Sequence, residues 1–141
     1  MSGSPKPRAH QVLLVDADFR SGQRLAELLT EDGFEVEMAR DGASAIARLS
    51  RGPAPATLIT ELTVALADGA AIARYGRGLD PSLRVIVLTR HPNLVVPAVF
   101  GSPAPTVLTK PLDYTKLLEL LEEAAKTESK SPGAGVASPI A

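Results

Sequence analysis

The sequence contains no cysteine, which excludes disulfide bonds, thiolate zinc sites and thiol nucleophiles. Its formal net charge is -1 and no basic run exceeds two residues, so a nucleic-acid partner is not expected. No segment approaches the roughly 18 apolar residues of a membrane span. The start, MSGSPKPRAHQ, lacks the apolar core of a secretory signal. A cytoplasmic protein with no membrane partner is the expectation.

Apolar residues make up 45% of the 141-residue chain, which suits one domain with a single core. Both ends differ from the middle. Residues 1–10 are rich in Pro, Ser and basic side chains, and residues 127–141 are rich in Pro, Gly and Ser. Such segments have little to bury. The sequence therefore predicts disordered tails over 1–10 and 127–141, and an ordered domain over 11–126.

Apolar runs of strand length alternate with helical patterns along this domain. Regular alternation of this kind predicts a parallel sheet covered by helices on both faces. The run FEVEMA alternates apolar and charged residues, as a half-exposed edge strand should. Asp41, Asp68 and Asp113 are expected to cap helices. The expected strands are 11–15, 34–39, 57–60, 84–89 and 106–109, and the expected helices are 19–32, 41–52, 68–77 and 113–126.

Four polar residues stand at the ends of predicted strands: Asp16, Glu61, Thr89 and Lys110. In open parallel sheets, sites form at the carboxyl ends of the strands. We therefore expect two acids, a hydroxyl and an amine to converge on one crevice. Burying a carboxylate without a partner costs several kcal/mol. Glu61 is thus expected to face this site. The alternative is that it lies in solvent at the end of its strand and has no role.

The motifs LLVDAD, ITELTVALADG, VIVLT and LTKP, at this spacing, resemble the receiver domain of bacterial two-component response regulators. The resemblance covers about residues 12–125. It implies a flavodoxin-like (βα)5 fold, a doubly wound parallel five-stranded sheet in the order 2-1-3-4-5. In this family a histidine kinase phosphorylates an Asp at the end of the third strand. Mg²⁺ is held by that Asp and by a pair of acids after the first strand.

Carried over by position, the resemblance places Glu61 at the phosphoacceptor and Asp16 at the first acid. Ala17 stands where the family has its second acid, and Asp18 is a further acid beside the pocket. Glu is one methylene longer than Asp, which moves its carboxylate by roughly 1.5 Å. Mg²⁺ demands near-ideal octahedral oxygen geometry. A metal site formed by Asp16 and Glu61 is therefore expected to be weak or lost, and no other cofactor is expected.

The resemblance also assigns residues on the last two strands. Thr89 and Lys110 match the hydroxyl and the amine that contact the phosphoryl oxygens. The family pattern implies a cis peptide bond before Pro111. Val107 replaces an aromatic residue that moves inward on activation, and Ala65 replaces the Pro that usually follows the acceptor by four residues.

Residues 91–105, HPNLVVPAVFGSPAP, hold four prolines where the family has its fourth helix. Pro97 inside a helix would cost about 3 kcal/mol or more, so we expect a degenerate helix, as a short turn or an irregular loop. Phe100 is expected to pack in the core or the loop rather than to dock a partner. The usual signalling face is thus expected to be remodelled into a fixed surface.

These departures predict a pseudo-receiver, an atypical single-domain response regulator that acts mainly as a protein-interaction module and not as an enzyme. Glu61 would pair with Lys110, and the partner would be a histidine kinase or a downstream signalling protein. The alternative is a functional Mg²⁺-dependent phospho-receiver that accepts phosphate from a histidine kinase. An unrelated flavodoxin-like binder has less support, because VDADFRSG after the first strand is not a Gly-rich phosphate loop.

Overall fold

The computed structural model of the protein describes residues 6–64 and 68–137, and for 127–137 it describes the backbone alone. Ala65 lies outside the described residues. Five strands form one sheet in the order β2-β1-β3-β4-β5, and every neighbouring pair is parallel. This confirms the predicted doubly wound, flavodoxin-like sheet. The strands are β1 Gln11–Val15, β2 Glu35–Ala39, β3 Thr57–Glu61, β4 Arg84–Thr89 and β5 Thr106–Thr109.

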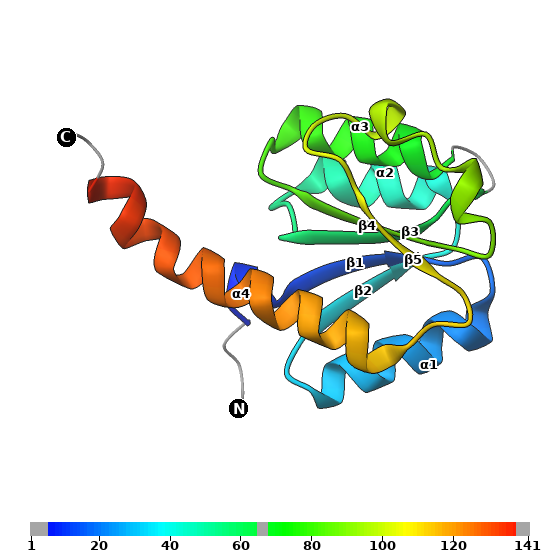
Figure 1. Ribbon diagram of the computed structural model, residues 1–141, viewed down its shortest axis with the longest axis horizontal. Coiled ribbons are helices and arrows are strands. Elements are labelled where there is room, and N and C mark those ends of the chain that lie inside the picture. The colour runs from blue at the N-terminus through cyan, green and yellow to red at the C-terminus, as the bar shows by residue number, and fades with distance from the viewer. Residues whose placement is uncertain (1–5, 65–67, 138–141) are drawn as a thin grey trace.

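Two helices cover each face of the sheet (Figure 1): α1 and α4 lie on one side, α2 and α3 on the other. Asp18, Asp41 and Asp68 each accept backbone hydrogen bonds at the start of the helix that follows, which satisfies N–H groups that the helix itself cannot pair. Within the described residues, no helix is long and apolar enough to cross a membrane. The helices are α1 Phe19–Glu31, α2 Gly42–Arg51, α3 Gly69–Leu79 and α4 Tyr114–Ala137.

The core consists of two apolar layers, one on each face of the sheet. Side chains alternate between the faces along a strand, so Leu13 and Val15 of β1 pack toward α2 and α3. Val12 and Leu14 of the same strand pack toward α1 and α4. The interior strands are buried on both faces, which explains why their sequences are continuous apolar runs. On the edge, β2 alternates exposed and part-buried residues as expected.

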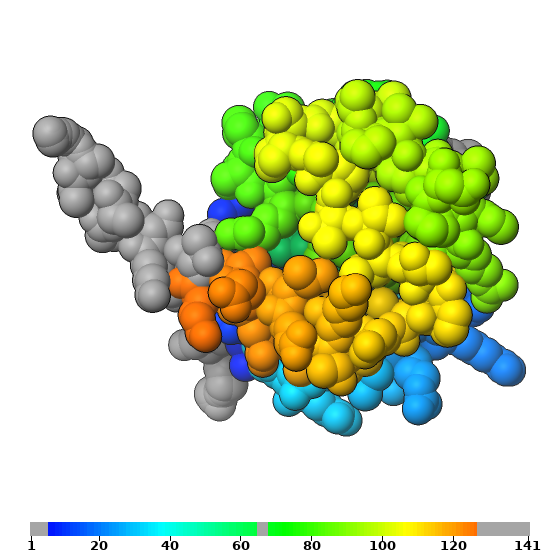
Figure 2. Space-filling view, viewed as in Figure 1, coloured from blue at the N-terminus to red at the C-terminus, as the bar shows by residue number. Residues whose placement is uncertain are grey.

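The segment between β4 and β5 forms two short 3-10 turns, Pro92–Leu94 and Pro97–Phe100, in place of a fourth α-helix. Phe100 is fully buried and belongs to the core. The buried side chain of Arg77 on α3 holds this segment by donating hydrogen bonds to the backbone carbonyls of Phe100 and Pro103. In Figure 2 the lime and yellow atoms of this segment form part of the surface above the orange α4. The predicted irregular segment is therefore present and packed.

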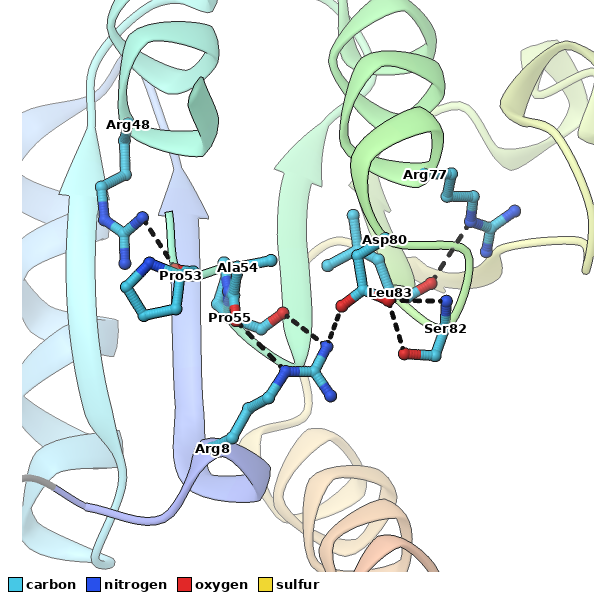
Figure 3. A network of polar contacts seen from close by, with 9 residues as sticks. All are labelled: Arg8, Arg48, Pro53, Ala54, Pro55, Arg77, Asp80, Ser82 and Leu83. Atoms are coloured by element: carbon cyan, nitrogen blue, oxygen red, sulfur yellow. Dashed lines mark hydrogen bonds and ion pairs between the residues drawn. The ribbon is translucent and has the colours of Figure 1, made fainter. Parts of the chain in front are cut away.

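The expected boundaries of the domain differ from the observed elements at both ends. Residues 8–10, expected to lie in a disordered tail, form a 3-10 helix. Arg8 anchors it by donating to the carbonyls of Ala54 and Pro55 and by pairing with Asp80 (Figure 3). At the other end, α4 was expected to stop at Lys126 and extends to Ala137. The extension runs through Pro132, Gly133 and Gly135, residues with low helix propensity, and the local sequence does not explain it.

Candidate functional site

Glu61 and Lys110 form an ion pair at the carboxyl edge of the sheet. Glu61 is the last residue of β3 and Lys110 follows β5, with β4 between them. Lys110 Nζ donates a hydrogen bond to Glu61 Oε2, and the two side chains are 22% and 23% exposed. Neighbouring strands lie about 4.8 Å apart, so two side chains from β3 and β5 must together reach across roughly 10 Å. The long Glu and Lys side chains can do this.

Asp16 and Asp18 are both engaged by the first turn of α1. Asp16 is 4% exposed. Its Oδ1 accepts from the backbone N–H of Asp18 at 2.8 Å, and its Oδ2 accepts from Ser21 Oγ at 3.0 Å. Asp18 in turn accepts from the N–H groups of Arg20 at 3.0 Å and Ser21 at 3.4 Å. Asp16 thus lies buried at the site, whereas the carboxylate of Asp18 serves as the cap of the helix.

Thr89 and Lys110 are adjacent through their backbones. The carbonyl of Thr89 accepts from the N–H of Lys110 at 2.8 Å, which fixes where the lysine side chain begins. The hydroxyl of Thr89, a residue only 6% exposed, accepts from the N–H of His91 at 2.9 Å. The bond between Lys110 and Pro111 is cis. Val107 lies part-buried on β5 opposite Val87 of β4.

The parallel sheet and its strand order are those that the sequence motifs implied. The sequence profile of the response regulator receiver domain matches residues 12–122. The chain belongs to this family. Receiver domains are signalling modules of two-component response regulators rather than typical enzymes, and this chain contains one such domain.

Similar proteins include a response regulator receiver protein of Anaeromyxobacter sp. (strain Fw109-5), 31% identical over 77% of this chain and 45% of that protein. The receiver protein CpdR of Brucella abortus is 27% identical over 80% of this chain and 94% of its own length. The chain thus spans less than half of the first relative and nearly all of the second. Among solved structures, the signal receiver domain of an HD-domain-containing protein from Pseudomonas fluorescens is 25% identical with a TM-score of 0.77, covering 95% of this chain and 99% of that one.

Receiver domains typically bind Mg²⁺ at an acidic pocket, and the residues of this receiver fit that ion poorly. Mg²⁺ prefers several oxygen ligands in octahedral geometry. Both carboxylate oxygens of Asp16 already accept hydrogen bonds, Ala17 offers none, and Glu61 is paired with Lys110. Among the side chains that the structure describes, over 6–64 and 68–126, no three of Asp, Glu, His or Cys are grouped so that they could hold a metal. We therefore assign no step to a metal at this site.

Two contacts at the site were missed by sequence reasoning. Ser21 donates a hydrogen bond to Asp16 and so restrains the carboxylate. Ser21 lies five residues after Asp16, in the first turn of the predicted helix, and this position could have indicated the contact. The backbone N–H of His91 donates a hydrogen bond to the hydroxyl of Thr89. Almost every residue type has a backbone N–H, so the identity of residue 91 could not indicate this contact.

Proposed function

We propose that this receiver domain acts in two-component phosphorelay signal transduction mainly as a protein-interaction module, and that it is not phosphorylated efficiently. The observation that carries the proposal is the ion pair between Glu61, at the acceptor position, and Lys110. The amine that contacts the phosphoryl group in the family is here already neutralised by a side chain of the chain itself. We place the protein in the cytoplasm of a bacterium.

The chemistry of phosphoryl transfer supports this reading. Catalysis depends on in-line positioning and on charge neutralisation, and a misplacement of about 1 Å can reduce a rate by about 10²-fold. The extra methylene of Glu61 moves its carboxylate by roughly 1.5 Å relative to an Asp. The missing acid at Ala17 weakens the metal site as well. Both changes act against phosphorylation.

The pair would reproduce part of the phosphorylated state. A phosphoryl group brings a charge of about -1.5 to -2 and three strong acceptor oxygens, whereas Glu61 brings one charge and two oxygens. Its contact with Lys110 is therefore a partial and permanent substitute. Together with the bound hydroxyl of Thr89 and the small side chain of Val107, it favours one fixed conformation of the β4–β5 side.

Exposed apolar residues on the two 3-10 turns offer a surface for a protein partner. Leu94, Val96 and Val99 are 62%, 56% and 44% exposed, on a segment that Arg77 holds in place. Clustered exposed apolar side chains are typical of interaction sites. The partner is expected to be a histidine kinase or a downstream signalling protein.

The test of phosphorylation is the intact mass of the native chain after incubation with acetyl phosphate and Mg²⁺. We expect no gain of about 80 Da, the mass of one phosphoryl group. The alternative, a working phospho-receiver, is supported by the retained Asp16, Thr89 and Lys110. A stable gain of that mass within minutes, absent from a Glu61→Gln variant, would establish the alternative and overturn our proposal.

The role of the carboxylate is tested by partner binding. A partner recovered with the full chain is compared for its affinity to the native protein, Glu61→Asp and Glu61→Ala. We expect weaker binding by both variants, because Asp withdraws the carboxylate from Lys110 by about one bond length and Ala has no charge. Equal affinity in all three would remove any role for Glu61 in the interaction.

A further inference from the structure

A cavity of about 320 Å³ lies near the edge of the sheet where the strands begin. Figure 2 shows this face hollowed between the orange α4 and the yellow segment that leads into β5. Apolar side chains form much of its wall, among them Val85, Ile86, Leu120 and Leu121. Protein cavities that hold small organic ligands start at about 300 Å³, so this one has the size for a small ligand.

Arg77 lines this cavity and is only 8% exposed. Its Nε donates to the carbonyl of Leu83 at 3.3 Å, and its Nη1 donates to the carbonyls of Phe100 and Pro103. Its Nη2 has no partner among the described residues and is not sealed from solvent. Burial lowers the pKa of the Arg77 guanidinium, because the charged form loses hydration. Carbonyl dipoles alone leave this buried cation without a counter-charge.

Arg84, at the start of β4, adds a second guanidinium to the lining. Its Nη2 donates to the carbonyl of Ala124 at 3.4 Å, which is long for a hydrogen bond. Neither Arg77 nor Arg84 pairs with a carboxylate within the part of the chain that the structure describes. Glu123 also lines the cavity and is exposed. The lining therefore carries more positive than negative charge.

We propose that this cavity binds a small organic anion, a carboxylate carried on an aromatic or aliphatic body. The guanidinium groups of Arg77 and Arg84 would receive the carboxylate, because a planar guanidinium matches a carboxylate with two parallel hydrogen bonds. The apolar wall would bind the body of the ligand by removing its surface from water.

This site is separate from the pair of Glu61 and Lys110. The cavity is lined by Arg84 and Thr106, the first residues of β4 and β5, whereas the pair lies at the opposite ends of the strands. A strand rises about 3.3 Å per residue, so the step from Arg84 to Thr89 covers roughly 16 Å. The binding proposal therefore goes beyond the proposed function, and either can fail without the other.

The test is a titration of the full ¹⁵N-labelled chain with benzoate and 2-naphthoate, followed by backbone amide chemical shifts. Benzamide and 2-naphthamide serve as neutral analogues of the same shape. We expect saturable shifts over residues 84–86, 104–106 and 120–124, and binding of the amides weaker by about tenfold or more. Arg84→Gln is expected to weaken carboxylate binding by about tenfold while the chain stays folded, since Arg84 donates one long hydrogen bond.

The matched control is Arg51→Gln, which removes an exposed guanidinium at the end of α2, outside the cavity lining. It is expected to bind the carboxylates as the native chain does. The proposal is overturned by equal binding of acids and amides, by shifts that map to another surface, or by undiminished binding in Arg84→Gln. Absence of saturable shifts up to about 10 mM of either carboxylate would overturn it too.

Discussion

Two substitutions should convert this receiver into a phosphorylated one. Glu61→Asp withdraws the carboxylate by roughly 1.5 Å, which weakens its contact with Lys110 and gives the acceptor position the side-chain length that the family has. Ala17→Asp supplies the second acid beside Asp16. Ala17 is exposed, so the new carboxylate displaces no packed side chain. Under the proposed function, the first change restores the length of the acceptor side chain and the second adds an oxygen ligand for Mg²⁺.

The expected size of the effect follows from geometry. A misplacement of about 1 Å costs about 10²-fold in rate, so the double variant should gain about 80 Da from acetyl phosphate at least about 100-fold faster than the native chain. Each single variant should fall between them. The assay is intact-mass spectrometry over time with Mg²⁺, with circular dichroism to show that all four chains are folded. The reasoning is refuted if the native chain reacts as fast as the double variant, or if the folded double variant does not react.

Two further predictions concern stability. Arg77→Ala should lower the free energy of unfolding, measured in urea, by about 2–4 kcal/mol. Three backbone carbonyls lose a charged donor, and the relief of burying a charge offsets only part of this loss. A decrease below about 0.5 kcal/mol would contradict the prediction. For Asp80, burial raises the pKa, but hydrogen bonds from Ser82 and the charge of Arg8 bring it below its ordinary value. This stabilisation is fully present above about pH 4 and is lost as pH falls through the lowered pKa of the folded state. Asp80→Asn should therefore cost about 1 kcal/mol at pH 7 and progressively less as pH falls below about 4. A cost that does not decrease between neutral and acidic pH would contradict this.

The strand order and helix starts could be predicted because their causes are local. Apolar runs of β1, β3 and β4 mark strands buried on two faces, and an Asp before an amphipathic stretch marks a helix start, as Asp41 and Asp68 show. The four prolines over 91–105 likewise exclude a regular helix by a local steric rule. The convergence of Glu61 and Lys110 followed from topology, since parallel strands bring their carboxyl ends to one edge.

Contacts between distant segments could not be predicted in the same way. Arg77 reads as an ordinary helical arginine, yet it is buried and holds the segment before β5. Arg8 lies in a Pro-rich start that resembles a tail, and its side chain is what fixes that start against Asp80. The direction of Asp18 depended on whether its carboxylate capped α1 or turned to the pocket. Its hydrogen bonds to the first turn of α1 resolve this.

Under the proposed function, the pair of Glu61 and Lys110 takes the place of a reversible phosphoryl group. A ligand shifts a conformational equilibrium only by the difference between its affinities for the two states. Because a carboxylate of the chain is present at all times, a receiver that works in this way would not respond to whether its kinase is active. We therefore expect regulation of this protein to act through the amount of the chain and its partner, or through a ligand in the cavity beside Arg77. Arg77 lines the cavity and donates to the carbonyl of Phe100, which ends the second 3-10 turn next to the exposed Val99. This contact gives a ligand in the cavity a physical connection to the surface that a partner would meet.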